Sequence, residues 1–109
     1  MPTLVYSREE MEAVVRQRYP AKDPEALERM LRSLPLNQRF TTLRSIHNLS
    51  QAEMAEAIGM KRNAVSNWEA EMDDSRRTVP QPETRARLGY AFHLPPSVFA
   101  EDEPEIPLD

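Results

Sequence analysis

The chain has 109 residues, a formal net charge of −4 and no cysteine. This length allows one small domain, or one domain with an added arm, and a core of modest size. Without cysteine, the chain has no disulfide framework, no zinc–thiolate site and no thiol nucleophile. No apolar run approaches the roughly 20 residues that cross a bilayer, and the sequence does not open on a signal-peptide core. We therefore expect an intracellular protein without a membrane partner.

The acidic charge is concentrated at the C-terminal end of the sequence. Residues 1–35 hold six basic and six acidic side chains, and residues 36–99 hold eight basic and seven acidic ones. Residues 100–109 hold five acidic side chains and no basic one. The central segment can therefore present a locally basic face although the whole chain is acidic. The tail, residues 101–109, is expected to be disordered in the free protein.

Two helices are predicted in the N-terminal segment, residues 1–35. Ser7 opens a capping box for a helix over 7–19, and Asp23 caps a second helix over 24–34. Each helix has a narrow apolar stripe, so we expect it to pack on the rest of the domain or on a second copy of the chain. The two stripes consist of Met11, Val14 and Val15, and of Leu27, Met30, Leu31 and Leu34.

A third helix is expected from about Leu36, with Asn37 as its cap. Asn48 can end this helix in the left-handed conformation. The residues that we expect to face the core are Phe40, Leu43 and Ile46.

The segment 49–69, LSQAEMAEAIGMKRNAVSNWE, predicts two short helices joined by a tight turn. Ser50 and Glu53 form a capping box at the first helix, and Gly59 supplies the positive φ that ends it. In the second helix, Val65 and Trp68 point inward at three-residue spacing. The outward positions carry residue types that contact phosphates and base edges, namely Lys61, Arg62, Asn63, Ser66 and Asn67.

After residue 69 the pattern predicts a loop, a helix and a short final turn. Residues 70–81 are polar, of mixed charge and rich in proline towards their end, as is typical of a surface loop. Pro82 or Glu83 opens a helix, and Gly89 inside it indicates a close contact between helices. A short turn over 94–100 covers the core. No alternating run predicts a strand, so the fold class is all-α.

From about residue 36 to residue 99 the chain resembles the Cro/Xre-type, phage-repressor-like helix-turn-helix family. The matching stretches are Leu43-Arg44, LSQAEMAEAIG, VSNWE and PETRARLGYAFHLPPSVF, which cover four consecutive helices. The resemblance implies a five-helix DNA-binding domain over 36–100, preceded by a two-helix extension over 1–35.

The resemblance also implies roles for individual residues. Gln51 would touch a DNA phosphate and brace the recognition helix, and Arg44 would pair with Glu69. The recognition helix, residues 61–69, would enter the major groove, where Arg62 is the best candidate to read a guanine. The alternative is that its outward positions are only solvated. The DNA-binding candidates are Gln51, Lys61, Arg62, Asn63, Ser66, Asn67, Arg76 and Arg77.

The chain departs from the family pattern at three places. The cap of the recognition helix is Lys61, where the family has Ser, Thr or Asp. The loop after that helix is longer than usual and holds acidic residues at 71, 73 and 74. His93 stands where a glycine usually ends the fourth helix.

We expect no enzymatic activity, no metal site and no cofactor. The loop carboxylates lack the alternating spacing, central glycine and distal glutamate of a calcium loop. His47 and His93 are far apart in the sequence and have no partners at ligand spacing. A nucleophile, a base and oxyanion donors cannot be assembled from these residues.

Three functions remain open at this stage. The first is a sequence-specific regulator of transcription that binds double-stranded DNA, most simply a dimeric repressor on a palindromic operator, with a cytoplasmic, nucleoid-associated location. The second is an antitoxin that binds DNA and also a protein toxin, through residues 1–35 or through the acidic tail. The third is a protein-interaction module that has lost DNA binding.

Overall fold

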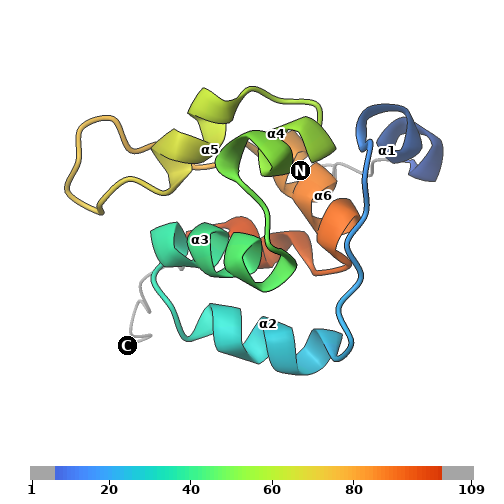
Figure 1. The fold of residues 1–109 in the computed structure, drawn as a ribbon, viewed down its shortest axis with the longest axis horizontal. Coiled ribbons are helices and arrows are strands. Elements are labelled where there is room, and N and C mark those ends of the chain that lie inside the picture. Colours follow the sequence, from blue (N-terminus) through green and yellow to red (C-terminus); the bar gives the residue numbers. More distant parts are fainter. Residues whose placement is uncertain (1–6, 102–109) are drawn as a thin grey trace, which may run out of the picture.

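The computed structural model describes residues 7–101, and this part of the chain is entirely helical (Figure 1). The predicted all-α fold class is confirmed, and the five helices expected from residue 36 to residue 100 are α3 to α6 and η1. Of the tail predicted to be disordered, residues 102–109 lie outside the described range. In the described part, no helix is long and apolar enough to cross a membrane. The helices are α1 (Arg8–Val14), α2 (Pro24–Arg32), α3 (Leu36–His47), α4 (Gln51–Ala57), α5 (Arg62–Trp68), α6 (Pro82–Phe92) and the 3-10 helix η1 (Pro96–Phe99).

One hydrophobic core joins all parts of the described chain. Phe40 of α3 lies at its centre, with its ring 5.3 Å from that of Trp68 and 6.0 Å from that of Phe99. The N-terminal extension contributes Leu27 and Leu31 to the same cluster. The apolar stripes of the extension are therefore largely covered within the chain, which removes the main reason for expecting them to form a dimer contact.

The start of α3 differs from the prediction. Asn37 does not cap the helix, because α3 begins one residue earlier, at Leu36, with Pro35 in the cap position. The Pro35 carbonyl already accepts hydrogen bonds from the backbone amides of Gln38 and Arg39, at 3.0 and 3.2 Å. Asn37 therefore lies inside the first turn, where it is buried.

The end of α3 also differs from the prediction. Ile46 is 49% exposed, although the pattern placed it in the core. The inward position after Leu43 is taken by His47, whose ring lies 5.5 Å from both Tyr19 and Phe92. Burial lowers the pKa of His47, so the neutral ring is favoured among these aromatic neighbours. The four-residue spacing from Leu43 to His47 carries the core face, and the three-residue spacing to Ile46 leads out of it.

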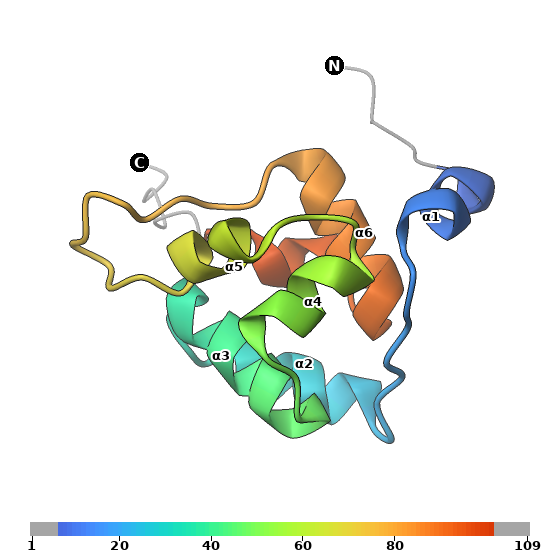
Figure 2. The same cartoon turned by 45° about the horizontal axis from the view of Figure 1, so that its top comes forward.

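The predicted helix over 7–19 is wrong in its second half. Ser7 caps the helix as expected, but α1 ends at Val14, and residues 15–21 run in extended form as a segment that we call the strap (Figure 2). The amide of Arg16 donates to the Ala57 carbonyl at 2.7 Å, and that of Tyr19 donates to the Ala91 carbonyl at 2.6 Å. Both carbonyls lie in the last turns of helices, where backbone acceptors lack intrahelical partners. Satisfying them favours the extended strap over a longer α1.

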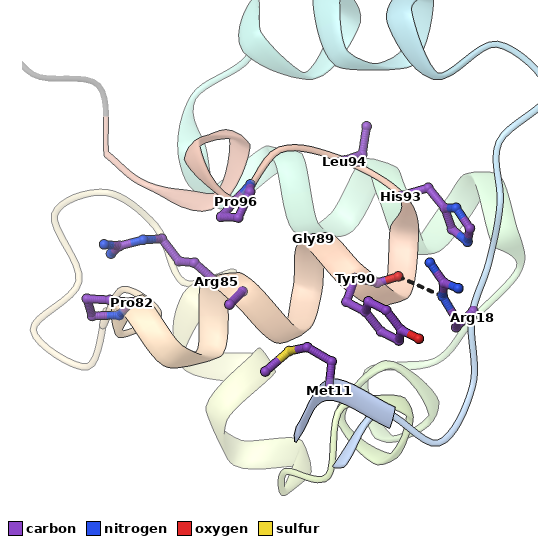
Figure 3. A pocket seen from close by; sticks show the side chains of 10 residues that line it. Met11, Arg18, Pro82, Arg85, Gly89, Tyr90, His93, Leu94 and Pro96 are labelled. Carbon is purple, nitrogen blue, oxygen red and sulfur yellow. Dashed lines mark hydrogen bonds between the residues drawn. The ribbon is translucent and has the colours of Figure 1, made fainter. Parts of the chain in front are cut away.

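The C-terminal end of α6 is closed tightly by the chain that follows it. A Cβ atom on Gly89 would lie 2.6 Å from the Leu94 carbonyl oxygen, so the close contact is made with the turn after α6 and not with another helix. His93 ends α6 with φ 58°, the left-handed conformation expected where glycine is usual. Figure 3 shows the strap against this region: Arg18 lies over the Tyr90 ring, 3.9 Å from its centroid, and donates to the Tyr90 carbonyl at 3.0 Å.

Candidate nucleic-acid interface

A capped helix and a glycine turn hold α4 and α5 in a fixed relation. The side chain of Ser50 accepts from the Glu53 amide at 3.0 Å, and the Glu53 carboxylate accepts from the Ser50 amide at 3.0 Å, so the predicted capping box is confirmed. Gly59 adopts φ 71°, as predicted. The Met60 amide then donates back to the Ala55 carbonyl at 2.8 Å, which closes the turn.

The orientation of α5 follows from its two buried residues. Val65 has no exposed surface and Trp68 is 3% exposed, so this side of the helix faces the core as predicted. The opposite side is therefore presented to the surroundings. Its members are Lys61, Arg62 and Asn63, which are exposed, and Ser66 and Asn67, which are half-buried.

A buried ion pair joins α5 to α3. The guanidinium of Arg44 donates from Nε to Glu69 Oε2 at 2.7 Å and from Nη2 to Glu69 Oε1 at 2.6 Å. The Glu69 side chain is only 7% exposed, and its hydrogen bonds with Arg44 raise the pKa of that arginine. Two parallel hydrogen bonds fix both the distance and the angle between the partners. The end of the recognition helix is thus held in one orientation against α3.

Gln51 connects this buried pair to the exposed surface. Its Nε2 donates to Glu69 Oε1 at 3.2 Å, and its Oε1 accepts from Arg62 Nη1 at 3.2 Å. The amide therefore lies between a buried carboxylate and the guanidinium that we expect to read DNA. This arrangement holds the Arg62 side chain before any DNA is bound.

The N-terminus of α5 carries positive charge and no side-chain cap. Lys61 is the N-cap residue, and its side chain makes no capping hydrogen bond. The orphan amides of the first turn and the cations at 61 and 62 lie together, which is an arrangement suited to an anion. A helix of this length does not by itself define an anion site, but here it adds to the charge of the exposed face.

The loop over 70–81 extends beyond the end of α5 (Figures 1 and 2). In it, Arg76 donates to both carboxylate oxygens of Asp74, at 3.2 and 2.9 Å, and its amide donates to Asp74 Oδ1 at 2.8 Å. These bonds lower the pKa of Asp74 from 3.8 to about 2. Asp74 and Arg76 line a hollow together with Ser66 and Asn67, so Arg76 lies beside the recognition helix but is already paired.

Arg77 is turned away from the recognition helix. Its Nη2 donates to the carboxylate of Glu101, and its side chain is 15% exposed. The structure therefore brings Gln51 and the outward residues of α5 together, places Arg76 beside them, and does not place Arg77 with them.

Two contributors to the site were missed by the sequence analysis. The hydroxyl of Thr41 donates to Glu69 Oε1 at 3.0 Å, and it lies one turn before Arg44 on α3, a spacing that could have revealed it. The strap also supports α4 and the Gly59 turn, because a Cβ atom on Gly59 would lie 3.1 Å from the Val14 carbonyl oxygen. That support comes from backbone atoms, which carry no signal in the sequence.

The remaining polar residues form no metal-binding cluster within residues 7–101. The hydrogen-bonding face of α5 is therefore the feature of the described chain that calls for a macromolecular ligand.

Comparisons with known proteins agree with this geometry. A family described as Helix-turn-helix matches residues 43–76, which include the end of α3, all of α4 and α5, and the start of the loop. No match was found among curated proteins or among solved structures. The match supports a DNA-binding helix-turn-helix regulator, which is a type of protein without enzymatic activity. Residues 43–76 are a helix-turn-helix of the Cro/Xre family.

Proposed function

We propose that this protein is a sequence-specific transcriptional regulator that reads double-stranded DNA in the major groove with residues 61–69. The observation that carries this proposal is the connection from the buried Arg44–Glu69 pair through Gln51 to Arg62. A reading side chain must be held close to its productive geometry by residues that are themselves fixed. The chain from α3 to Arg62 supplies that support.

The residues of α5 divide into base readers and phosphate binders. Arg62 is suited to the two acceptors of guanine, and Asn63 or Asn67 is suited to adenine. Lys61 and Ser66 are suited to phosphates, which position the protein without specifying a sequence. Gln51 would keep one contact with Glu69 while it approaches a phosphate. Arg76 would join them only after leaving Asp74.

We further propose that the regulator is a dimeric repressor on a palindromic operator. One recognition helix covers only a few base pairs, so a single copy gives low selectivity. Two copies about 34–36 Å apart would read half-sites one helical turn apart on one face of the duplex. Occupying such a site blocks other proteins from the same DNA, which is the simplest form of repression.

The test is selection of binding sites from a random duplex pool. The wild-type chain is expected to enrich a palindrome, and the Arg62→Ala, Asn67→Ala double variant is expected to enrich none. Each lost base contact should weaken binding to the selected site by about 1–3 kcal/mol. Arg16→Ala, Gln17→Ala is the matched control, because it removes the same residue types from the exposed strap and should select the wild-type palindrome.

The outcomes separate the parts of the proposal. A single enriched half-site would retain DNA reading and reject the dimer. Loss of enrichment in the control variant as well would assign the effect to folding or to general charge, not to α5. No enrichment by the wild-type chain at low salt would reject the proposal and favour a protein partner, as expected of an antitoxin or an interaction module.

A further inference from the structure

An apolar groove lies between α2 and α3, on the part of the fold across α3 from α4 and α5 (Figure 1). Its volume is about 470 Å³. Two exposed hydrophobic side chains line it, Met30 at 42% and Ile46 at 49% exposure. The one other large hydrophobic residue that is exposed in residues 7–101 is Met72, in the loop after α5. Exposed apolar surface is thus gathered at this groove.

The core of the chain does not need these two side chains. Leu27 and Leu31 carry the inward face of α2, and Leu43 and His47 carry that of α3. Met30 lies outside that face, as Ile46 does on α3. Gathered apolar side chains at an exposed groove commonly mark a contact with another macromolecule.

A polar atom at the groove also lacks a partner. His47 lines the groove, and its Nε2 is buried without a hydrogen-bond partner among the described residues. Buried polar atoms are nearly always hydrogen-bonded, so such an atom needs a donor or acceptor from elsewhere. A docked macromolecule could supply it along with an apolar surface.

The charges around the groove indicate what docks there. Lys22 and Asp23 line it, and Glu25 and Arg29 stand one position before Ala26 and Met30 on α2. The rim therefore carries two positive and two negative side chains. A rim of balanced sign does not attract DNA or a strongly acidic peptide, but it can pair with itself.

We propose that this groove binds a second copy of the chain in a two-fold symmetric contact. In such a contact the same surface is present on both sides, so each cation of the rim meets an anion of the other copy while Met30 and Ile46 pack at the centre. Methionine suits this position because its flexible side chain adapts to an irregular surface. The inference rests on the proposed dimeric regulator and assigns its interface, which leaves the exposed face of α5 uncovered.

The test compares oligomeric states of the full chain by sedimentation velocity at micromolar concentrations. The wild-type chain is expected to sediment as a dimer, and the Met30→Lys, Ile46→Lys variant as a monomer with a dimer dissociation constant raised at least 100-fold. Both positions lie in the last turns of their helices, where lysine is compatible with helical structure. Met72→Lys is the matched control, since it changes the third exposed hydrophobic residue, and it should remain dimeric.

A second pair of variants tests the rim independently. Lys22→Glu, Arg29→Glu makes the rim wholly acidic, and Glu25→Lys makes it net basic. Each variant alone should be largely monomeric at low salt, and an equimolar mixture should form a heterodimer. Absence of dimer in the mixture would overturn the self-pairing argument.

The outcomes distinguish the interface from the function. A dimeric Met30→Lys, Ile46→Lys variant would overturn this interface while leaving a dimeric regulator in place. A wild-type chain that stays monomeric, free and on the selected duplex, would overturn the inference and the dimer together. Retained binding of the lysine variant to a duplex carrying one selected half-site would show that DNA reading is intact, so failure of the groove and failure of α5 are separable.

Discussion

Two arginine–carboxylate pairs flank the recognition helix, and they differ in almost every physical respect. Arg44 and Glu69 are 25 residues apart, and the carboxylate side chain is 7% exposed. Asp74 and Arg76 are two residues apart in a surface loop, and the arginine side chain is 79% exposed. Both pairs are joined by two side-chain hydrogen bonds of similar length, so bond geometry alone would not distinguish them.

The difference lies in what each pair holds. The buried carboxylate of Glu69 also accepts hydrogen bonds from Thr41 and Gln51, so it joins α3, α4 and the end of α5. The exposed pair of Asp74 and Arg76 joins neighbouring residues of one loop and competes with water. We infer that the first pair sets the position of the recognition helix and that the second sets only the local shape of the loop.

The largest expected effect comes from breaking the buried pair. Glu69→Ala would leave the Arg44 guanidinium largely buried without its carboxylate, and unpaired buried charges are strongly destabilising. Because Arg44 retains some exposure and a hydrogen bond to the Leu49 carbonyl, we expect a loss of about 2–3 kcal/mol in the free energy of unfolding. Urea denaturation followed by Trp68 fluorescence would measure it.

The matched control for this change is Glu71→Ala. Glu71 is an exposed carboxylate two residues further along the chain, and its removal should leave the urea midpoint unchanged. The Arg44→Met, Glu69→Met variant should recover part of the lost stability, because replacing both members of a buried pair leaves no unpaired charge. Equal destabilisation by Glu69→Ala and Glu71→Ala would contradict the assigned difference between buried and exposed carboxylates.

A smaller effect is expected where the buried pair reaches the surface. Gln51→Met keeps the length of the side chain but removes its bonds to Glu69 and Arg62. We expect a loss of about 1 kcal/mol in stability, since a hydrogen bond to a charged and only partly exposed group contributes somewhat more than a neutral one. Binding to the selected duplex should weaken by more than the stability change accounts for, because Arg62 loses its support.

Gln38→Met provides the comparison for that variant, because Gln38 is exposed on α3 away from Glu69. It should change neither stability nor DNA affinity. If Gln51→Met lowered stability but left DNA affinity at the wild-type value, Gln51 would be a structural residue only, and the buried pair would not extend to the DNA-reading surface.

The helix-turn-helix was predictable from sequence because its signals are local. The Ser50–Glu53 capping box, the positive φ of Gly59 and the inward spacing of Val65 and Trp68 each depend on residues within one or two helical turns. Arg44 and Glu69 were named together only through the family resemblance. Nothing in their own sequence surroundings indicates which charged residue 25 positions away is the partner.

The N-terminal segment was predicted less well, and for a physical reason. The helix expected over 7–19 stops at Val14 because strap amides bind carbonyls in the last turns of α4 and α6. Those acceptors are more than 40 residues away in the sequence and belong to the backbone, so no side-chain pattern reports them. Ile46 was misplaced for a related reason, since only the assembled core shows that His47 stacks on Tyr19 and Phe92.

The smallest expected effect on stability is at the exposed pair, and its measurable sign is a titration. Hydrogen bonds from Arg76 lower the pKa of Asp74 to about 2, so its carboxylate should stay ionised until the pH falls to that value, as NMR of the carboxyl carbon would show. A lowered folded-state pKa stabilises the fold above the ordinary value of 3.8, and this contribution is lost as the pH falls through about 2.

Arg76→Ala should return the Asp74 titration towards 3.8 without shifting the urea midpoint at neutral pH, because solvent screens an exposed pair. Asp74→Asn should likewise preserve stability, but it frees the Arg76 guanidinium beside Ser66 and Asn67. Affinity for random duplex should then rise at low salt, with a gain that vanishes as salt screens the added cation. Destabilisation of either variant to the extent expected for Glu69→Ala would mean that the loop pair also holds the recognition helix, and the two pairs would then differ in exposure but not in role.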